Sequence, residues 1–234
     1  GDTTFAIAYD TDGDRLYASV GPKAPAIVQM DTTDPRGPRL IGKGYAYQQI
    51  DGAGAISPDG TLAVAGSMVG QRPVFRLNDR GTGEPVAVLT DDASITESVA
   101  FSSDGRWVAT VSDSERLQIY AVDDLTGPAI EADVGALPLS VAFQPGDPGR
   151  ADQPIIAVAA TDKRVHLYRL DPDHRAVEQI ATVGGFDNWV YAVAFAPGGR
   201  TLFASSADRT LRVYDVSEPT DPRQIGGAYD GPRD

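Results

Sequence analysis

Apolar and polar positions alternate along this chain in short runs separated by turn residues, and the arrangement recurs five times. In the clearest copy, an alternating run ends at Phe101, Ser103–Gly105 supply an Asp-Gly turn, and a second apolar run covers 107–111. Alternation with period two is typical of β-strands, and Gly readily adopts the positive φ that such a turn requires. A third run at 117–122 and a fourth at 129–134 complete the copy. Each copy therefore predicts four short antiparallel strands.

Apolar anchor residues that end the first strand of each copy set the period of the repeat. The equivalent anchors are separated by 47, 45, 42 and 52 residues, and they are Tyr9, Ile56, Phe101, Phe143 and Phe195. A second set of anchors lies in the third predicted strand: Val28, Phe75, Tyr120, Tyr168 and Tyr214. A repeat of about 40–50 residues with several short strands is the signature of a β-propeller blade. Adjacent blades bury apolar surface against one another, so we expect both sets of anchors to pack between blades.

The predicted fold is therefore all-β, a β-propeller of four-stranded antiparallel blades with about five blades in this chain. We expect one domain or propeller segment over residues 1–234, with blades near 1–47, 48–92, 93–134, 135–184 and 185–234. Five blades could be part of a larger propeller, form a compact ring, or form an open arc that another chain completes. The start at Gly1 favours the first of these alternatives.

The segment WVYAVAFAPGGRTLFASSADRTLRVYDVSEP, residues 189–219, resembles a WD repeat of the kind found in many bacterial proteins. The copies that begin near Val99 and Val141 resemble the same repeat, and Tyr214-Asp215 stands where the family has its Trp-Asp pair. Arg outnumbers Lys by 17 to 3, which fits a GC-rich bacterial genome. The resemblance implies a propeller that serves as a protein-interaction or sensor module of a larger bacterial protein.

One part of the family pattern is missing. The family has a Gly-His pair before the first strand, and its His belongs to a buried hydrogen-bonded tetrad with an Asp in the second turn. No copy in this chain has that pair. By resemblance, Asp113, Asp162 and Asp208 hold the Asp position. Because the usual partner is absent, we expect these residues to stabilise turns, where an Asp side chain accepts bonds from the nearby backbone.

The resemblance also implies where a partner would bind. WD propellers usually bind partners on the face whose loops enter the innermost strands, at positions six and four residues before each first-strand anchor. These positions hold Thr3 and Phe5, Ile50 and Gly52, Ile95 and Glu97, Leu137 and Leu139, and Trp189 and Tyr191. Trp and Tyr dominate binding hot spots, so we expect a partner-binding rim centred on Trp189 and Tyr191, with Phe186 presented by the preceding loop. The alternative is that these rings pack onto blade edges and fill the central channel.

Charge and composition narrow the classes of partner. The formal net charge is −13, and Lys and Arg are scattered singly, so nucleic acid is not expected as a partner. No apolar run is long enough for a membrane span, and no signal-peptide pattern is present. The chain has no Cys, which excludes disulfides and thiolate metal sites and suits a reducing compartment. We therefore expect a cytoplasmic protein without membrane contact.

Catalytic motifs are absent from the sequence. There is no G-x-S-x-G elbow and no Gly-rich loop that ends in Lys-Ser or Lys-Thr. The two histidines, His166 and His174, are predicted to be exposed. The run Asp10–Asp14 resembles the start of a calcium loop, but no Glu follows at the required distance, so we interpret it as a turn. We expect no metal, no cofactor and no catalytic residues.

The sequence thus favours a non-catalytic interaction or scaffold module that binds a protein or other domains of its parent protein. One alternative is a propeller enzyme or small-molecule binder, similar to lactonases, that acts at the central channel. That alternative requires several carboxylates or histidines at the channel mouth, where the rim positions are mostly apolar. A third is a structural segment that self-associates or assembles with further blades.

Overall fold

A computed structural model describes residues 4–9, 13–20, 27–34, 36–47, 53–90, 94–146 and 153–231. Within these ranges the strands form five sheets of four strands each, and the one helical element is a short 3-10 turn, η1 (Val122–Asp124). The described strand pairings are antiparallel, and each sheet is built from strands that follow one another in the chain. The prediction of an all-β fold of four-stranded blades is confirmed.

The chain divides into two compact units. The first consists of Gly1–Phe101, Gly105–Val108 and Tyr120–Pro128, and the second of Ser102–Asp104, Ala109–Ile119 and Ala129–Asp234.

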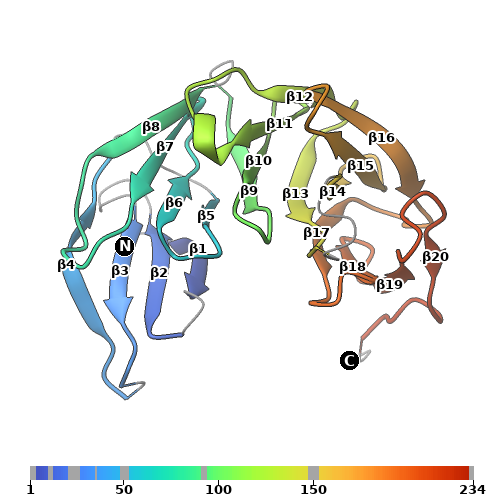
Figure 1. Ribbon diagram of the computed structural model, residues 1–234. Coiled ribbons are helices and arrows are strands. Elements are labelled where there is room, and N and C mark those ends of the chain that lie inside the picture. Colours follow the sequence, from blue (N-terminus) through green and yellow to red (C-terminus); the bar gives the residue numbers. More distant parts are fainter. Residues whose placement is uncertain are drawn as a thin grey trace. The chain divides into compact units, whose positions relative to one another are not determined.

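The first unit contains two complete sheets (Figure 1, blue to cyan). One consists of β1 (Thr4–Tyr9), β2 (Arg15–Val20), β3 (Ile27–Asp31) and β4 (Arg39–Tyr45). The other consists of β5 (Gly54–Ile56), β6 (Leu62–Ala65), β7 (Gln71–Arg76) and β8 (Pro85–Thr90). Their shared core is built from Tyr17, Ile27, Tyr45, Ala63, Ala65 and Phe75.

A close approach in the first unit requires glycine on both sides. β4 passes beside the turn between β7 and β8, where the Gly44 N–H donates to the Gly81 carbonyl over 2.9 Å. A Cβ on Gly42 would overlap the Arg80 carbonyl oxygen, and one on Gly81 would overlap the Ile41 carbonyl oxygen. Both glycines also have positive φ, 66° and 59°, so any side chain here would force the two segments apart.

The third sheet consists of β9 (Thr96–Phe101), β10 (Trp107–Ser112), β11 (Arg116–Ala121) and β12 (Ile130–Asp133), and it contributes residues to both units.

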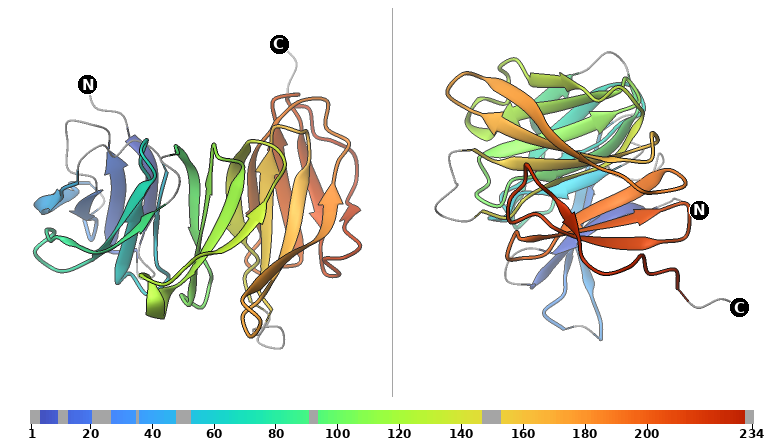
Figure 2. Two further views of the ribbon diagram at one scale, coloured as in Figure 1. Left: turned by 90° about the horizontal axis from the view of Figure 1, so that it is seen from above. Right: turned by 90° about the vertical axis from the view of Figure 1, so that its right-hand side faces the viewer.

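The second unit also contains two complete sheets. The first of them has β13 (Pro138–Phe143), β14 (Ile155–Ala160), β15 (Val165–Asp171) and β16 (Ala176–Val183). The second has β17 (Val190–Phe195), β18 (Thr201–Ser206), β19 (Leu211–Asp215) and β20 (Arg223–Gln224). These two sheets lie next to one another, with β17 packed on β13 and β14 (Figure 2, yellow to red). The core between them includes Ala157, Leu167, Val193, Leu202 and Tyr214.

Most of the predicted anchors are covered. Phe75, Phe143, Tyr120, Tyr168 and Tyr214 are buried, and Ile56, Phe101 and Phe195 are half-buried. Val28 is also half-buried, but its assignment as an anchor was wrong by two residues, because Met30 holds the place next to Leu16 and Tyr9 in the register. Tyr9 contradicts the prediction, because 59% of its surface is exposed. Within the first unit, the second sheet packs on the opposite face of β1–β4, which carries Tyr17 and Ile27, so it does not bury the Tyr9 ring.

Candidate functional site

The predicted rim positions coincide with β-bulges at the start of the first strand of a sheet. The strand register shifts between Thr4 and Ala6, between Pro138 and Ser140, and between Val190 and Ala192. The extra residues are Phe5, Leu139 and Tyr191, which lie four residues before an anchor. A bulge re-aims side chains at the end of a strand.

Trp189 and Tyr191 form an exposed aromatic pair at the start of β17. Their side chains are 47% and 52% exposed. The ring centroids are 6.4 Å apart and the planes meet at 85°, an edge-to-face arrangement that aromatic rings prefer. Each ring therefore supports the other while both stay accessible to a partner.

Hydrogen bonds fix the loop that carries this pair. The Asp187 N–H donates to Asp208 Oδ2 over 2.9 Å, and the Trp189 N–H donates to Asn188 Oδ1 over 2.9 Å. In return, the Trp189 carbonyl accepts the Ala207 N–H over 2.9 Å. The loop is thus tied to the turn between β18 and β19, which holds the Trp189 backbone in one position.

Asp208 stabilises its own turn as well as this loop. Its Oδ1 accepts the Thr210 N–H over 2.8 Å and the Thr210 hydroxyl over 2.6 Å. Partial burial raises the pKa of Asp208, but the bonds from Thr210 and from the Asp187 N–H outweigh burial and hold the pKa below its ordinary value. We expected a turn residue, and the second task, anchoring the loop of Trp189, was not predicted.

Asp162 has a different partner. Its Oδ2 lies 3.1 Å from His166 Nε2, and His166 Nδ1 lies 3.2 Å from Gln179 Oε1. His166 is only 5% exposed, so the prediction of an exposed histidine is wrong for this residue. The reason is that β15 is covered on both faces, with Val165, His166, Leu167 and Tyr168 all buried. His174, by contrast, has an exposed side chain.

Asp113 does not hold the position predicted for it. Glu115, Lys163 and Arg209 have positive φ of 61°, 70° and 70° and mark the same point in three successive turns. The residues just before them are Ser114, Asp162 and Asp208. Ser114 therefore takes the place equivalent to Asp208, and its hydroxyl pairs with that of Ser112 at 2.8 Å. The assignment of Asp113 was wrong by one residue.

Phe186 is not part of an exposed rim. It is 5% exposed, its ring centroid lies 6.4 Å from that of Tyr214, and the Arg212 guanidinium lies 5.0 Å above it. This cation–π contact and the neighbouring ring hold Phe186 in the core.

The other predicted rim residues vary in exposure. In the second unit, Leu137 and Leu139 are half-buried. In the first unit, Ile95 is 36% exposed and Glu97 is half-buried. The remaining rim residues fall outside what the structure describes: Thr3, Ile50, Gly52 and the side chain of Phe5.

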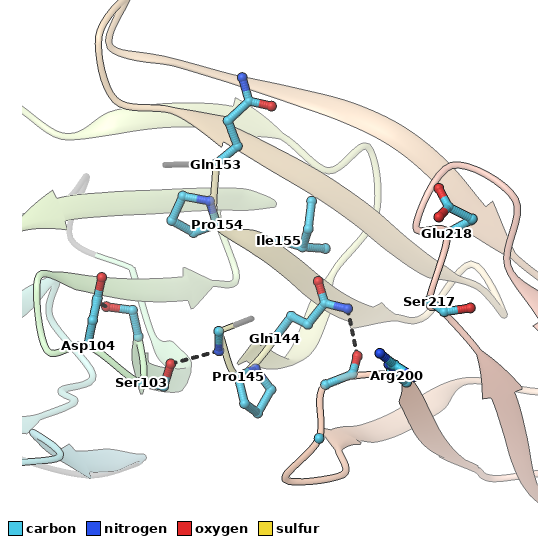
Figure 3. A pocket seen from close by; sticks show the side chains of 14 residues that line it. Ser103, Asp104, Gln144, Pro145, Gln153, Pro154, Ile155, Arg200, Ser217 and Glu218 are labelled. Atoms are coloured by element: carbon cyan, nitrogen blue, oxygen red, sulfur yellow. Dashed lines mark hydrogen bonds between the residues drawn. The ribbon is translucent and has the colours of Figure 1, made fainter. Parts of the chain in front are cut away.

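A cleft of about 420 Å³ in the second unit lies at the other end of these strands (Figure 3). Gln144 crosses its floor and donates from Nε2 to the Gly199 carbonyl over 2.6 Å, and charged groups come from Asp104, Arg200 and Glu218. Trp189 precedes β17 and Gly199 follows it, so a strand of about 20 Å separates the cleft from the aromatic pair. The cleft and the pair are separate features.

Within the described ranges, no group of three or more His, Asp or Glu side chains is close enough together to hold a metal ion. Among the same residues, no helix has the length and apolar character needed to cross a membrane.

Residues 83–120 and 177–215 match the family model described as "WD domain, G-beta repeat". The chain carries WD40 repeats. The second matched segment includes Trp189, Tyr191 and Asp208, so the aromatic pair and its anchor belong to one such repeat.

Three curated relatives of the chain are fungal proteins. It is 29% identical over 159 residues to nuclear distribution protein nudF of Aspergillus niger, which covers 62% of this chain and 35% of that protein. Identity to nudF of Emericella nidulans is 30% over 176 residues, which cover 67% of this chain and 38% of that protein. Identity to nuclear distribution protein PAC1 of Arthroderma benhamiae is 25% over 201 residues, which cover 76% of this chain and 42% of that protein.

The chain thus spans between 35% and 42% of the length of these three relatives. They support the WD-repeat assignment, and their fungal source gives no support to the bacterial type of repeat expected from the sequence.

Proposed function

We propose that this chain is a non-catalytic protein-interaction module that binds a partner protein through Trp189 and Tyr191. The observation that carries the proposal is this pair of large aromatic side chains, about half exposed on a hydrogen-bonded loop. Such residues bury much area on binding and lose little conformational freedom when their loop is already fixed. An exposed position for two rings has no benefit for the stability of the chain itself, since their apolar surface stays in water.

The WD40 repeats support a scaffold role rather than catalysis. The relatives are nuclear distribution proteins, and the likeness lies in less than half of their length, so they support the repeat and nothing more specific. We further propose a single domain or propeller segment over 1–234, with the five blade boundaries given above, in a cytoplasmic protein. Its partner is another protein or a further domain of the same protein.

Charge favours a basic partner surface. The chain has a formal net charge of −13, and the exposed Asp187 and Asn188 lie next to Trp189 in the sequence. A Lys or Arg side chain of the partner can therefore stack on the Trp189 face while its charge lies close to Asp187.

Affinity capture with variant chains tests the proposal. The wild-type chain, the double variant Trp189→Ala/Tyr191→Ala and the control Leu40→Ala serve as baits in a lysate, with captured proteins identified by mass spectrometry. Leu40 is 60% exposed on β4, so it controls for loss of any exposed apolar residue. We expect a protein held by wild type and by Leu40→Ala and lost by the double variant. Retention by a folded double variant, verified by circular dichroism, would overturn the proposal.

A further inference from the structure

The cleft in the second unit presents side chains that the exposed aromatic pair does not use. The described residues that line it all belong to that unit. They come from the turn after β9, from the residues after β13 and before β14, from the turn between β17 and β18, and from the residues after β19. The volume of about 420 Å³ lies in the range of pockets that hold small ligands, about 300–1,000 Å³. The cleft is therefore large enough for a ligand of its own.

Gln144 is held so that its amide oxygen faces the cleft. Its backbone N–H donates to the Ile155 carbonyl over 2.8 Å, and its Nε2 donates to the carbonyls of Gly199 and Val216 over 2.6 and 3.4 Å. Because the amide nitrogen makes these bonds, Oε1 points the other way, toward Ile155 in Figure 3. Among the described residues, no donor is bonded to this oxygen. Gln144 thus presents one fixed acceptor to a ligand.

The turn that contains Gly199 also positions Arg200 at the cleft. The Gly199 N–H closes the turn on the Ala196 carbonyl over 2.8 Å, and Gly199 has a positive φ of 69°. A Cβ on Gly199 would lie 2.6 Å from the Pro145 carbonyl oxygen, so this turn can approach the end of β13 only with glycine there. The Arg200 carbonyl accepts the Val216 N–H over 2.9 Å, which fixes the Arg200 backbone beside the cleft.

The Arg200 side chain brings a positive charge to the cleft. Within the part of the chain that the structure describes, no hydrogen bond or ion pair engages its guanidinium, and the residue is exposed. A guanidinium presents several N–H donors in one plane and matches a carboxylate with two parallel hydrogen bonds. The chain as a whole is acidic, with a net charge of −13, so an anion here is held by this local group and not by the overall field. Arg200 therefore indicates a single carboxylate as the charged part of a ligand.

The other lining groups limit what can accompany that carboxylate. Pro145 and Pro154 are half-buried and Ile155 is buried, and they supply apolar surface to the cleft. Asp104 and Glu218 add carboxylates on opposite sides of it in Figure 3, and these repel a second negative charge. A fitting ligand therefore has one carboxylate, an N–H donor for the fixed amide oxygen and an apolar group.

We propose that the cleft binds the C-terminal residues of a partner protein, with the terminal carboxylate on the Arg200 guanidinium. A chain terminus combines the three groups that the cleft selects: a carboxylate, the N–H of the last peptide bond and the last side chain. The N–H donates to Gln144 Oε1, and an apolar last side chain packs on Ile155 and Pro154. This site is separate from the exposed aromatic pair and does not depend on the interaction proposed for that pair.

Amide NMR of the isotope-labelled chain, titrated with short peptides, tests the proposal. The probes are acetyl-Gly-Ser-Ala peptides that end in Leu, Val or Phe with a free carboxylate, the same peptides with a C-terminal amide, and one that ends in Glu. We expect the free apolar termini to shift the signals of Gly198, Gly199 and the Gln144 side-chain amide. The C-terminal amide should weaken binding about 10-fold or more, as expected when a hydrogen bond to a charged group is lost. A last Glu should also weaken binding, because Asp104 and Glu218 repel it.

Matched variants assign the binding to Arg200. Arg200→Gln should weaken binding of the free-carboxylate peptides about 10-fold or more and leave binding of the amidated peptides unchanged. Arg209→Gln removes another exposed arginine, from the turn between β18 and β19, and should bind within about twofold of wild type. Both replaced side chains are exposed, so both variants should keep the wild-type melting temperature. Trp189→Ala/Tyr191→Ala should bind the peptides as wild type does, which separates this site from the aromatic pair.

The proposal is overturned if none of the free-carboxylate peptides shifts these signals, if the amidated peptides bind as tightly as the free ones, or if Arg200→Gln binds as wild type does. An amidated peptide with an internal Glu that binds as tightly as a free terminus would also overturn it, because the cleft would then recognise a side-chain carboxylate. Shifts confined to the signals of Trp189 and Tyr191 would place the peptide at the aromatic pair and contradict a C-terminal site in the cleft.

Discussion

The two sheets of the second unit have the same strand order and register, yet they differ in what their side chains do. In β13–β16, the faces are covered and the positions before the first strand hold the half-buried Leu137 and Leu139. In β17–β20, the equivalent positions hold the exposed Trp189 and Tyr191. The backbone repeat fixes where a side chain lies, and the neighbouring sheet decides whether it is buried. Function then depends on which residue occupies an exposed position.

The largest expected effect comes from equivalent positions on the two third strands. Leu167 is 0% exposed, so Leu167→Ala removes buried methyl groups and leaves a cavity, at a cost of about 3 kcal/mol in the free energy of unfolding. Val213 is half-buried at the equivalent position of β19, and Val213→Ala should cost less than about 1 kcal/mol. Urea unfolding at a low protein concentration measures the free energy of unfolding of both variants. Equal losses in the two variants would contradict the difference in burial.

The second-largest difference in the free energy of unfolding is expected between polar side chains at equivalent positions of β15 and β19. His166 is buried and lies within hydrogen-bond distance of Asp162 and Gln179, so His166→Ala removes a buried ring and two hydrogen bonds, at a cost of about 2 kcal/mol. Arg212 at the equivalent position is half-buried and reaches Gln224 Oε1 at 3.4 Å. Replacing Gln224 by Ala should therefore change the unfolding free energy by less than about 0.5 kcal/mol. A His166→Ala loss as small as that of Gln224→Ala would show that the hydrogen bonds of His166 to Asp162 and Gln179 add no stability.

Asp208 makes the stability of the sheet β17–β20 depend on pH. Because its folded pKa is below its ordinary value, it contributes stability that is present above the unfolded pKa and is lost as pH falls through the folded pKa. Asp208→Asn should lower the unfolding free energy at neutral pH by about 1 kcal/mol and flatten the acid side of the stability curve. It should also weaken partner capture, since the Asp187 N–H loses a charged acceptor. If the unfolding free energy of Asp208→Asn falls with decreasing pH as steeply as that of wild type, Asp208 does not contribute to the pH dependence.

The smallest effect concerns two tyrosine hydroxyls. Burial raises the pKa of Tyr168 to about 12, and its hydroxyl has no hydrogen-bond partner among the described residues. Tyr168→Phe should therefore leave stability unchanged or raise it slightly. The Tyr214 hydroxyl donates to the Gly184 carbonyl over 3.3 Å, so Tyr214→Phe should lower the unfolding free energy by about 0.5–1 kcal/mol. Thermal unfolding of the two variants, measured side by side, should show a lower melting temperature for Tyr214→Phe and an equal or higher one for Tyr168→Phe.

The repeat of the anchors was enough to predict the sheets, because alternation and Asp-Gly turns are local features. Burial was harder to predict, because it depends on the adjacent sheet. Tyr9 is exposed although it is equivalent to the half-buried Phe195, and His166 is buried although a polar residue on an alternating strand usually faces water. The sequence pattern shows which side chains share a face of a sheet, whereas the degree of burial of that face depends on the sheet that packs on it.

The candidate site was predictable in part for the same reason. Trp189 and Tyr191 were identified from their distance to an anchor, and the bulge between Val190 and Ala192 is the physical basis of that spacing. Phe186 was misassigned because its burial depends on Arg212 and Tyr214, which lie more than twenty residues later in the chain. The one-residue error at Asp113 arose because adjacent polar residues in a turn cannot be ordered without the backbone conformation.

The most direct test of the proposed site is the affinity of the captured partner for variants at equivalent positions of the two sheets, measured by isothermal titration calorimetry. Trp189→Ala/Tyr191→Ala should weaken binding at least about 100-fold, as expected when two hot-spot residues are truncated. Leu137→Ala/Leu139→Ala should leave the affinity within about threefold of wild type while lowering the melting temperature, because these leucines are half-buried. Equal weakening by both variants, or none by the aromatic one, would contradict the account.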